Sequence, residues 1–331
     1  MNDIIIEKAI LHILDTSITT PVLADKLMAY SQQADEFLKI HIARAIEDAD
    51  IKKGAFKSEG EDIKKLISNV EDAAFIQGSQ QLAQQIFELA LSNPGIPAAD
   101  LLCCHFRYDN GLYFGLLKFN YKSSYIHQFN MADEFKETRI LKQNATIASE
   151  NQKLEEFAFI RLDDFSVLVK EKKVEINGAK DYYLSSQLLK VDTDLSPKAK
   201  VNIVEKAAQK VIKEFYGEDP LKVSQVKTEL KSCVDESSII EIDRITNAVF
   251  DGNFSAQQRY REEVAQKGIS GKAFEVTSEI EKKVARKQKI FTDSGIEISL
   301  PVDYLENKKK VEFIMNEDGT MSILIKAVVL R

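Results

Sequence analysis

The sequence predicts an α+β protein, in which helices and an antiparallel sheet come from separate stretches of the chain. Long runs with apolar residues at helical spacing stand beside short apolar runs separated by tight turns. Strands and helices do not alternate regularly, so the βαβ units of a parallel sheet are not expected. Hydrophobic residues make up 44% of the 331 residues and charged residues 29%, which is typical of globular proteins and excludes general disorder.

The first third of the chain predicts a strand followed by long helices. Residues 4–14 are mostly β-branched or apolar around a charged break at Glu7-Lys8, which favours a strand. The pair Thr20-Pro21 is typical of a cap and a first helical position, and helical spacing then continues over 21–50. A second helix or pair of helices is expected over 61–91, where an Asn-Pro-Gly turn ends it.

The middle of the chain predicts an antiparallel meander. Two apolar runs, 101–108 and 112–119, are separated by Asp109-Asn110-Gly111, whose residues tolerate the positive φ angles of a type I′ turn. This spacing predicts a hairpin. Further strands are expected over 138–147, 157–162 and 166–169, followed by an Asn-Gly turn.

From Ser196 onward, the pattern predicts a helical array that ends in an antiparallel β-meander. Ser196 and Pro197 form a cap and first-position pair, and one apolar face continues until Gly217. Further helices are expected at about 221–234, 238–250 and 254–267, and strands over 289–292, 296–300, 310–315 and 321–329.

The length and the charge distribution indicate two domains, 1–195 and 196–331, at roughly 150 residues per domain. Residues 1–195 carry 22 basic and 30 acidic side chains, a net charge of −8, whereas residues 196–331 carry 23 and 22, a net of +1. The whole chain has a formal charge of −7, which excludes a uniformly basic protein that coats nucleic acid. Any contact with a polyanion must therefore be local.

The cysteines and the apolar runs predict a cytoplasmic protein. Cys103 and Cys104 are adjacent and Cys233 is distant, so they form neither an even disulfide framework nor paired metal knuckles. The N-terminal apolar stretch lacks the basic start and small-residue cleavage site of a signal peptide. No uncharged run reaches the roughly 20 residues that span a bilayer, so no membrane contact is expected.

No sequence motif indicates a catalytic, metal or cofactor site. On a strand Cys103 and His105 share one face and could meet a metal, but two buried cysteines are the simpler interpretation. Residues 268–272 lack the spacing of a phosphate loop; they match a KH-type GxxG clamp or a helix stop followed by a turn. Asp163 and Asp164 are typical turn formers. We expect no cofactor and no enzymatic activity.

Basic side chains of the C-terminal part are the strongest indication of function. Residues 282–289 include five basic residues and no acid, and a lysine face lies opposite the apolar stripe of the helix that begins after Ser196. Such clusters can neutralise backbone phosphates, although a lysine face is also typical of any solvated helix. The DNA-binding candidates are Lys282, Lys283, Arg286, Lys287 and Lys289, with Lys206, Lys210 and Lys213 on the helix.

Four short stretches, in an order that spans nearly the whole chain, are similar to those of a known family. They are Ala9-Ile10-Leu11-His12, Cys104-His105-Phe106-Arg107-Tyr108, Phe159-Ile160-Arg161-Leu162-Asp163 and the segment from Ile296 to Tyr304. With the predicted final hairpin, they resemble the bacterial nucleoid-associated protein family of the NdpA/YejK type. The resemblance implies a cytoplasmic protein of the nucleoid that binds double-stranded DNA directly or through nucleoid proteins, without known enzymatic activity.

We therefore predict a non-catalytic nucleoid-associated protein that binds DNA weakly, and largely without sequence preference, through its C-terminal part. The main alternative is an interaction scaffold, in which the acidic N-terminal part docks a basic nucleoid protein and DNA association is indirect. An enzyme whose groups converge only in space is a third alternative. Homo-oligomerisation is left open.

Overall fold

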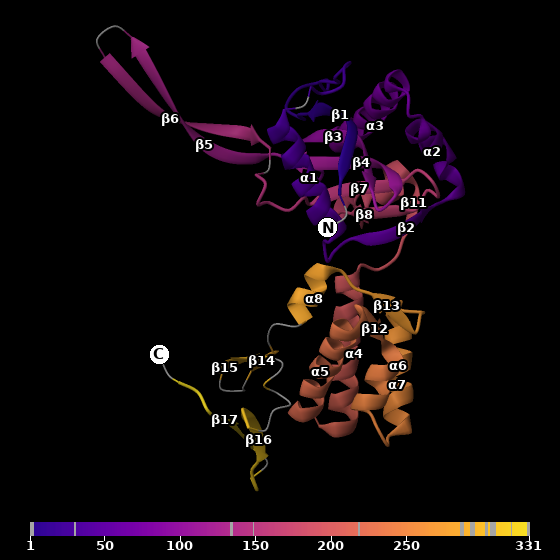
Figure 1. Cartoon of the computed structure of the whole chain (residues 1–331), viewed down its shortest axis with the longest axis vertical. Helices are drawn as coiled ribbons and strands as arrows, with labels where there is room; N and C mark the ends of the chain where they lie inside the picture. Colours follow the sequence, from indigo (N-terminus) through magenta and orange to yellow (C-terminus); the bar gives the residue numbers. More distant parts are fainter. Residues whose placement is uncertain are drawn as a thin grey trace. The chain divides into compact units, whose positions relative to one another are not determined.

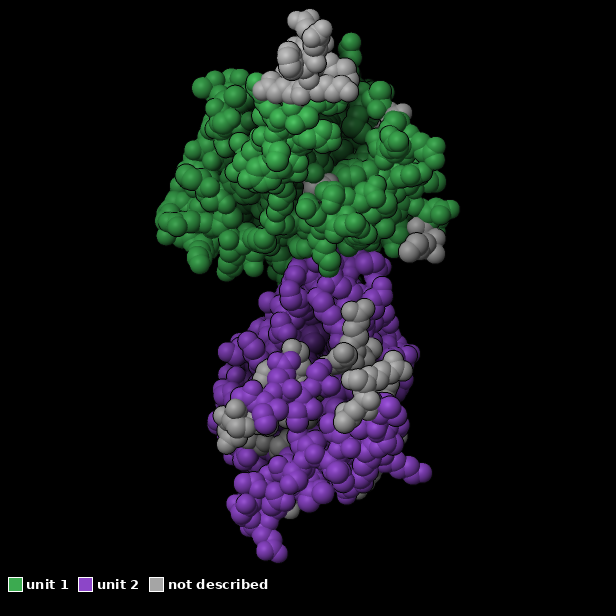
Figure 2. All heavy atoms as spheres, turned by 90° about the vertical axis from the view of Figure 1, so that its left-hand side faces the viewer, with its two compact units in different colours: residues 1–46, 51–194 green, residues 47–50, 195–331 purple. Residues whose placement is uncertain are grey.

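The computed structural model describes residues 3–29, 31–132, 135–147, 149–217, 219–284, 288–291, 295–301, 304, 309–318 and 320–329. The chain forms two compact units, which Figure 2 colours separately: unit 1 comprises residues 1–46 and 51–194, and unit 2 comprises residues 47–50 and 195–331. Helices and antiparallel strands occupy separate stretches, so the predicted α+β class is confirmed (Figure 1). None of the described helices is long and apolar enough to cross a membrane.

Unit 1 consists of an antiparallel sheet, its covering helices and two separate hairpins. The helices are α1 (Gln32–Ile46), α2 (Glu61–Ser68) and α3 (Asp72–Ser92), with a 3₁₀ turn η1 (Ser58–Gly60) and a π-helix η2 (Tyr183–Leu189). The strands are β1 (Ile5–Leu14), β2 (Lys52–Phe56), β3 (Ala99–Tyr108), β4 (Gly111–Asn120), β5 (Lys122–Ala132), β6 (Phe135–Thr146), β7 (Glu156–Arg161), β8 (Val167–Lys170), β9 (Val174–Ile176), β10 (Ala179–Asp181) and β11 (Val191–Thr193).

The main sheet has the strand order β1-β3-β4-β7-β8-β2-β11 within the described residues. Its β3–β4 hairpin turns at Asp109 and Asn110, whose φ angles of 47° and 58° confirm the predicted type I′ turn. Pairing of β1 with β3 shifts register between Ile6 and Lys8. The charged break predicted in the first strand is therefore a β-bulge that interrupts the register without ending the strand.

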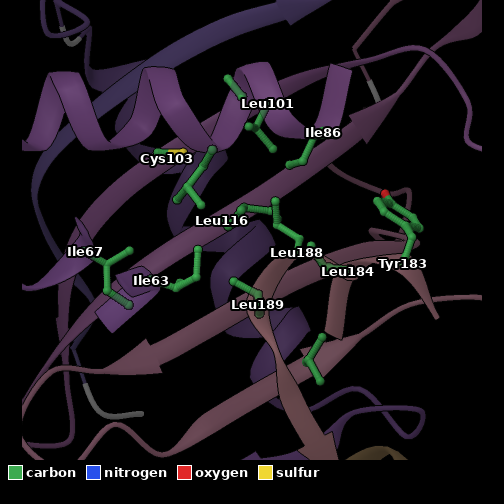
Figure 3. Packing of buried hydrophobic residues seen from close by; sticks show 14 of the residues in the cluster. Ile63, Ile67, Ile86, Leu101, Cys103, Leu116, Tyr183, Leu184, Leu188 and Leu189 are labelled. Atoms are coloured by element: carbon green, nitrogen blue, oxygen red, sulfur yellow. The ribbon is translucent and has the colours of Figure 1, made fainter. Parts of the chain in front are cut away.

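The two faces of this sheet carry different apolar clusters. Successive strand residues point to opposite faces, so Cys103 packs with α2, α3 and η2 whereas Cys104 packs with α1. Figure 3 shows Ile86 of α3 and Leu188 of η2 among the side chains of β3 and β4. All three cysteines are buried free thiols, and the described residues contain no group of side chains that could hold a metal ion.

The first helix begins later than the helical spacing predicts. α1 starts at Gln32, whereas the sequence placed the start at Pro21. Val22 instead exchanges two backbone hydrogen bonds with Ile13 of β1, each 3.0 Å long, so this segment runs beside the sheet. The Ser31 hydroxyl accepts a hydrogen bond from the backbone N–H three residues later at 3.1 Å, and it supplies the cap at the true start.

A long two-stranded ribbon projects from the main sheet of unit 1 (Figure 1). Its strands, β5 and β6, pair with each other and with no other strand in the described part of the chain. The sequence predicted β6 in part, over 138–147, and missed β5, where Ser, His, Gln and Asn interrupt the apolar pattern.

Unit 2 is a helical array followed by short hairpins. Ser196 caps the first of its helices by accepting a hydrogen bond from the Ala199 N–H at 3.3 Å, and Gly217 ends that helix with a φ of 63°, so both predicted ends are confirmed. The helices are α4 (Pro197–Tyr216), α5 (Pro220–Ser237), α6 (Ile242–Val249), α7 (Phe254–Gln266) and α8 (Ser278–Val284). The strands pair as β12 (Ile239–Glu241) with β13 (Ala273–Glu275), β14 (Gln288–Phe291) with β15 (Glu297–Leu300), and β16 (Val311–Met315) with β17 (Met321–Ile325).

The closing strands of unit 2 are antiparallel, as expected, and those described form two separate hairpins, β14–β15 and β16–β17. Between the paired strands, Asp293, Ser294 and Gly319 lie outside the described residues. The segment predicted as a helix from residue 238 begins as β12, and α6 follows it.

Candidate nucleic-acid interface

Lys282 and Lys283 lie in the last turn of α8, and both side chains are exposed. Cations at this end of a helix are favoured by the helix dipole. Lys289 belongs to β14, where the structure describes the backbone only. Arg286 and Lys287 lie outside the described residues. The structure thus places two of the five basic side chains of this run on the surface of unit 2.

Lys206, Lys210 and Lys213 are exposed on one face of α4, as their spacing predicts. The Lys210 Nζ lies 2.7 Å from the Glu263 Oε2 of α7, and the Arg259 guanidinium also contacts this carboxylate at 3.2 Å. The hydrogen bond from Lys210 lowers the pKa of Glu263, which keeps this carboxylate ionised. Much of the charge of Lys210 is therefore balanced within unit 2.

Three helices of unit 2 bring lysines together around one pocket. The pocket has a volume of about 210 Å³, and Lys198 of α4, Lys227 of α5 and Lys283 of α8 contribute to its walls. Lys198 and Lys227 were not among the predicted candidates, because they lie outside both the basic run at 282–289 and the lysine face of α4, and only the packing of three helices joins them to Lys283. The remaining lining residues are Val201, Asn202, Glu205, Ile280 and Val284.

Each lysine of this pocket contacts an acidic side chain. Lys198 Nζ lies 2.8 Å from Asp50 Oδ2, a hydrogen bond that raises the pKa of Lys198. Lys227 pairs with Glu205. Lys283 Nζ lies 2.6 Å from an oxygen of Glu279. Ion pairs on a protein surface contribute only about 0–1 kcal/mol, so these lysines can exchange a carboxylate for a phosphate at little cost.

The charge of unit 2 restricts any DNA contact to such a local surface. Residues 47–50 add three acidic side chains to residues 195–331, which leaves unit 2 with 23 basic and 25 acidic side chains and a net charge of −2. Unit 1 holds the other 22 basic and 27 acidic side chains, a net of −5. Neither unit attracts a polyanion through its overall charge.

The other short motifs of the sequence have structural roles. The backbone N–H of Ser166 donates to Asp164 at 2.8 Å, and the carboxylate of Asp163 lies 3.1 Å from the Nε of Arg161, so both aspartates belong to the β7–β8 turn. Gly268 follows α7 with a φ of 95°. The helix stop, one of the two interpretations of residues 268–272, is therefore the one that the structure shows.

We compared the whole chain with known proteins and with protein-family models. No protein among the curated sequences matches it. A family model described as "Nucleoid-associated protein YejK" matches residues 10–329, which includes nearly all of both units and all but one residue of the four stretches on which the resemblance rests. The chain therefore belongs to the YejK family of nucleoid-associated proteins.

Proposed function

We propose that this nucleoid-associated protein binds the phosphates of duplex DNA through unit 2, weakly and largely without sequence preference. The observation that carries the proposal is the pocket at which Lys198, Lys227 and Lys283 meet from three helices. The exposed Lys282 precedes the pocket residue Lys283 on α8, and Lys206 follows the pocket residue Glu205 on α4. Membership of a nucleoid-associated family supports a polyanionic partner. In this proposal the protein is not an enzyme.

The residue types at this surface favour contacts with phosphate over contacts with bases. A lysine ammonium is a point charge on a flexible stem, and it binds phosphate oxygens without a fixed planar geometry. The described residues that line the pocket include no aromatic side chain, so nothing there provides a platform for base stacking. Contacts of this kind release counterions and read no sequence.

The exposed lysines of α4 extend the proposed surface beyond the pocket. Lys206 and Lys213 are seven residues apart, which is two helical turns, and both lie on the exposed face. Lys210, between them, pairs with Glu263, as each lysine of the pocket pairs with a carboxylate. Arg286, Lys287 and Lys289 follow α8 in the sequence and stay candidates for the same contact.

Charge reversal at the pocket is expected to flatten the salt dependence of DNA binding. The affinity of a lysine-phosphate interface falls with salt, with a slope of about −0.9 per phosphate neutralised. The triple variant Lys227→Glu, Lys282→Glu, Lys283→Glu is expected to reduce this slope by roughly 2–3 in magnitude. Fluorescence anisotropy with a labelled duplex, from low to moderate salt, measures the slope for both proteins.

A control with the same change of net charge separates a local site from a general effect. Lys65, Lys172 and Lys180 are exposed on unit 1, and their triple reversal to glutamate should leave the slope nearly unchanged. Equal losses in the two variants would contradict a site on unit 2. Absence of any duplex binding by the unmodified protein at low salt would mean that contact with DNA is indirect.

The net charge of −5 on unit 1 favours one second candidate function. In this alternative the protein is a scaffold, whose acidic unit docks a basic nucleoid protein that itself binds DNA. The protein alone would then show no duplex binding at low salt, and reversal of acidic side chains on unit 1 would abolish its association with the basic partner.

A further inference from the structure

The proposed function rests on unit 2, and it leaves the ribbon of β5 and β6 in unit 1 without a role. Each strand has at least 11 residues, which corresponds to a length of about 35 Å at 3.3 Å per residue. It stands away from the main sheet (Figure 1). Two-stranded hairpins are at best marginally stable in water unless a further surface packs against them. A ribbon of this length therefore points to a partner.

The strand register sorts the side chains of the ribbon onto two faces. Tyr125 lies opposite Lys142, His127 opposite Ile140, and Phe129 opposite Thr138, so these six residues share one face, which we call the aromatic face. Its three large apolar side chains are mostly in solvent: the exposed fractions are 72% for Tyr125, 60% for Phe129 and 78% for Ile140. Ile126 and Leu141, which lie opposite each other on the second face, are less exposed.

We propose that the aromatic face packs against the same face of a second copy of this chain, so that two ribbons form the interface of a homodimer. A two-fold axis makes such an interface self-complementary, because each copy supplies both the surface and its partner. The aromatic side chains Tyr125 and Phe129 lie on β5, and Ile140 lies on β6. Laying β5 of one copy over β6 of the other thus pairs aromatic with β-branched side chains.

The exposed area of this face matches the requirement of a small dimer interface. An aromatic side chain buries about 150–250 Å², so at the stated fractions Tyr125, Phe129 and Ile140 together present roughly 400 Å² per copy. In the dimer, these side chains of the two copies together bury roughly 800 Å² of accessible surface. Stable specific interfaces bury at least about 1,200 Å² in total, so the proposed dimer requires the flanking polar residues of the face to bury the remaining ~400 Å². Exposed apolar patches of this size mark interaction sites.

The charge of the ribbon favours a second copy over DNA. Residues 122–147 contain four basic and three acidic side chains, so two ribbons meet without strong repulsion. A ribbon that enters a groove of DNA would require an excess of cations along its length. On the described part of the aromatic face, Lys142 is the single lysine or arginine beside the three apolar side chains.

Sedimentation equilibrium of the full chain tests the dimer. The unmodified protein is expected at the mass of two chains in the micromolar range, and the variant Phe129→Arg, Ile140→Arg should weaken dimerisation by at least about 100-fold. Phe254→Arg is the matched control, because Phe254 is an aromatic residue of unit 2 with 75% exposure and should not affect the dimer. A monomeric mass for the unmodified protein at all concentrations would overturn the proposal.

Cross-linking tests the geometry without adding charge to the ribbon. The native cysteines are buried, so a cysteine introduced on the ribbon is the reactive thiol. Ile140→Cys should give a covalent dimer with a short bis-maleimide, whereas Gln128→Cys, exposed on the second face, should give little. Equal cross-linking from both faces would contradict the proposal. Ribbon variants that keep the dimer mass and lose DNA binding would also contradict the proposal. That result would assign the ribbon to the contact with nucleic acid.

Discussion

Acidification from pH 7 to pH 5 is expected to destabilise unit 1 strongly and to affect unit 2 much less. His12, His41 and His105 are buried in unit 1, and burial lowers the pKa of each to about 4 from an ordinary value of 6.5. The sequence of unit 2 contains no histidine. The two units therefore provide a test and a control within one chain.

The direction of the effect follows from where the unfolded chain takes up protons. Below pH 6.5 an unfolded histidine is protonated, whereas these folded histidines stay neutral until about pH 4, so the free energy of unfolding decreases as the pH falls through this window. The decrease is about 1.4 kcal/mol per pH unit for each histidine. By pH 5 the three together remove roughly 6 kcal/mol, which is comparable with the whole stability of many domains. Above pH 6.5 no change from these groups is expected.

The contacts of His12 require its neutral form. Its Nδ1 accepts a hydrogen bond from the Ala24 N–H at 3.1 Å, so the ring proton is on Nε2, which donates to the Ser79 hydroxyl at 3.0 Å. The Ser79 hydroxyl in turn donates to the carbonyl of Ile76 at 2.8 Å. A proton on Nδ1 would remove the acceptor and leave the Ala24 N–H without this partner.

The other two histidines are neutral because their rings lie among aromatic side chains. The ring centre of His41 is 4.5 Å from that of Phe37 and 5.3 Å from that of Phe119, and desolvation, assisted by the charge of Arg44, lowers the pKa of His41. His105 lies 4.7 Å from Phe75, and burial is again the main cause of its lowered pKa. The charges of Glu7 and Asp72 act in the opposite direction at His105, but the cost of burial outweighs them.

Hydrogen exchange measured by mass spectrometry at several pH values, corrected for the intrinsic exchange rate, resolves the two units. Peptides of α3, β1 and β3 should lose protection between pH 6.5 and pH 5, before those of α4 and α7. His41→Leu should reduce the pH dependence of unit 1 by about one third, since it removes one of three equal contributions. His127→Gln, on the exposed ribbon, is the matched control. Simultaneous loss of protection in both units would contradict this origin.

The elements that the sequence predicted well are those fixed by local signals. The ends of α4 depend on Ser196 and Gly217, and the β3–β4 hairpin depends on two residues that accept positive φ. The start of α1 was wrong because pairing of Val22 with Ile13 prevails over local helical spacing. The strands β2 and β11 and the π-helix η2 were missed, because tertiary contacts and not periodicity define them. The strand β5 was missed because polar residues interrupt its apolar pattern.

In the candidate interface, too, residues marked by a local sequence signal were predicted and residues joined only by tertiary packing were not. A run of basic residues is visible in the sequence, so Lys282 and Lys283 were found. Lys198 and Lys227 reach the same pocket only through the packing of α4, α5 and α8. The fold also sets the carboxylate that each lysine meets: Lys210 pairs with Glu263, 53 residues away in the sequence. Charge patterns along a sequence thus predict where cations occur, whereas the fold decides which cations come together and which carboxylates they contact.

Replacing Lys118 by methionine is expected to lower the free energy of unfolding by about 3–5 kcal/mol. Lys118 lies on β4 with its side chain fully buried, and its Nζ is 2.7 Å from Glu156 Oε2 and 2.6 Å from Asn120 Oδ1. The hydroxyl of Tyr183 donates to the same oxygen of Glu156 at 3.0 Å. Burial lowers the pKa of Lys118 and the charge of Glu156 opposes this shift. Methionine fills the space but leaves the carboxylate of Glu156 without a cation.

Urea unfolding at pH 7.5, followed by circular dichroism, measures this loss against two controls. Lys122→Met removes an exposed pair with Glu155, 3.3 Å long, and should cost less than about 1 kcal/mol. The double variant Lys118→Met, Glu156→Leu should recover part of the loss, because buried pairs tolerate joint replacement by apolar residues. A loss from Lys118→Met no larger than that from Lys122→Met would contradict a buried charge network. If the double variant recovers stability, the penalty belongs to the isolated Glu156 carboxylate, and the pair itself contributes little to the net stability of unit 1.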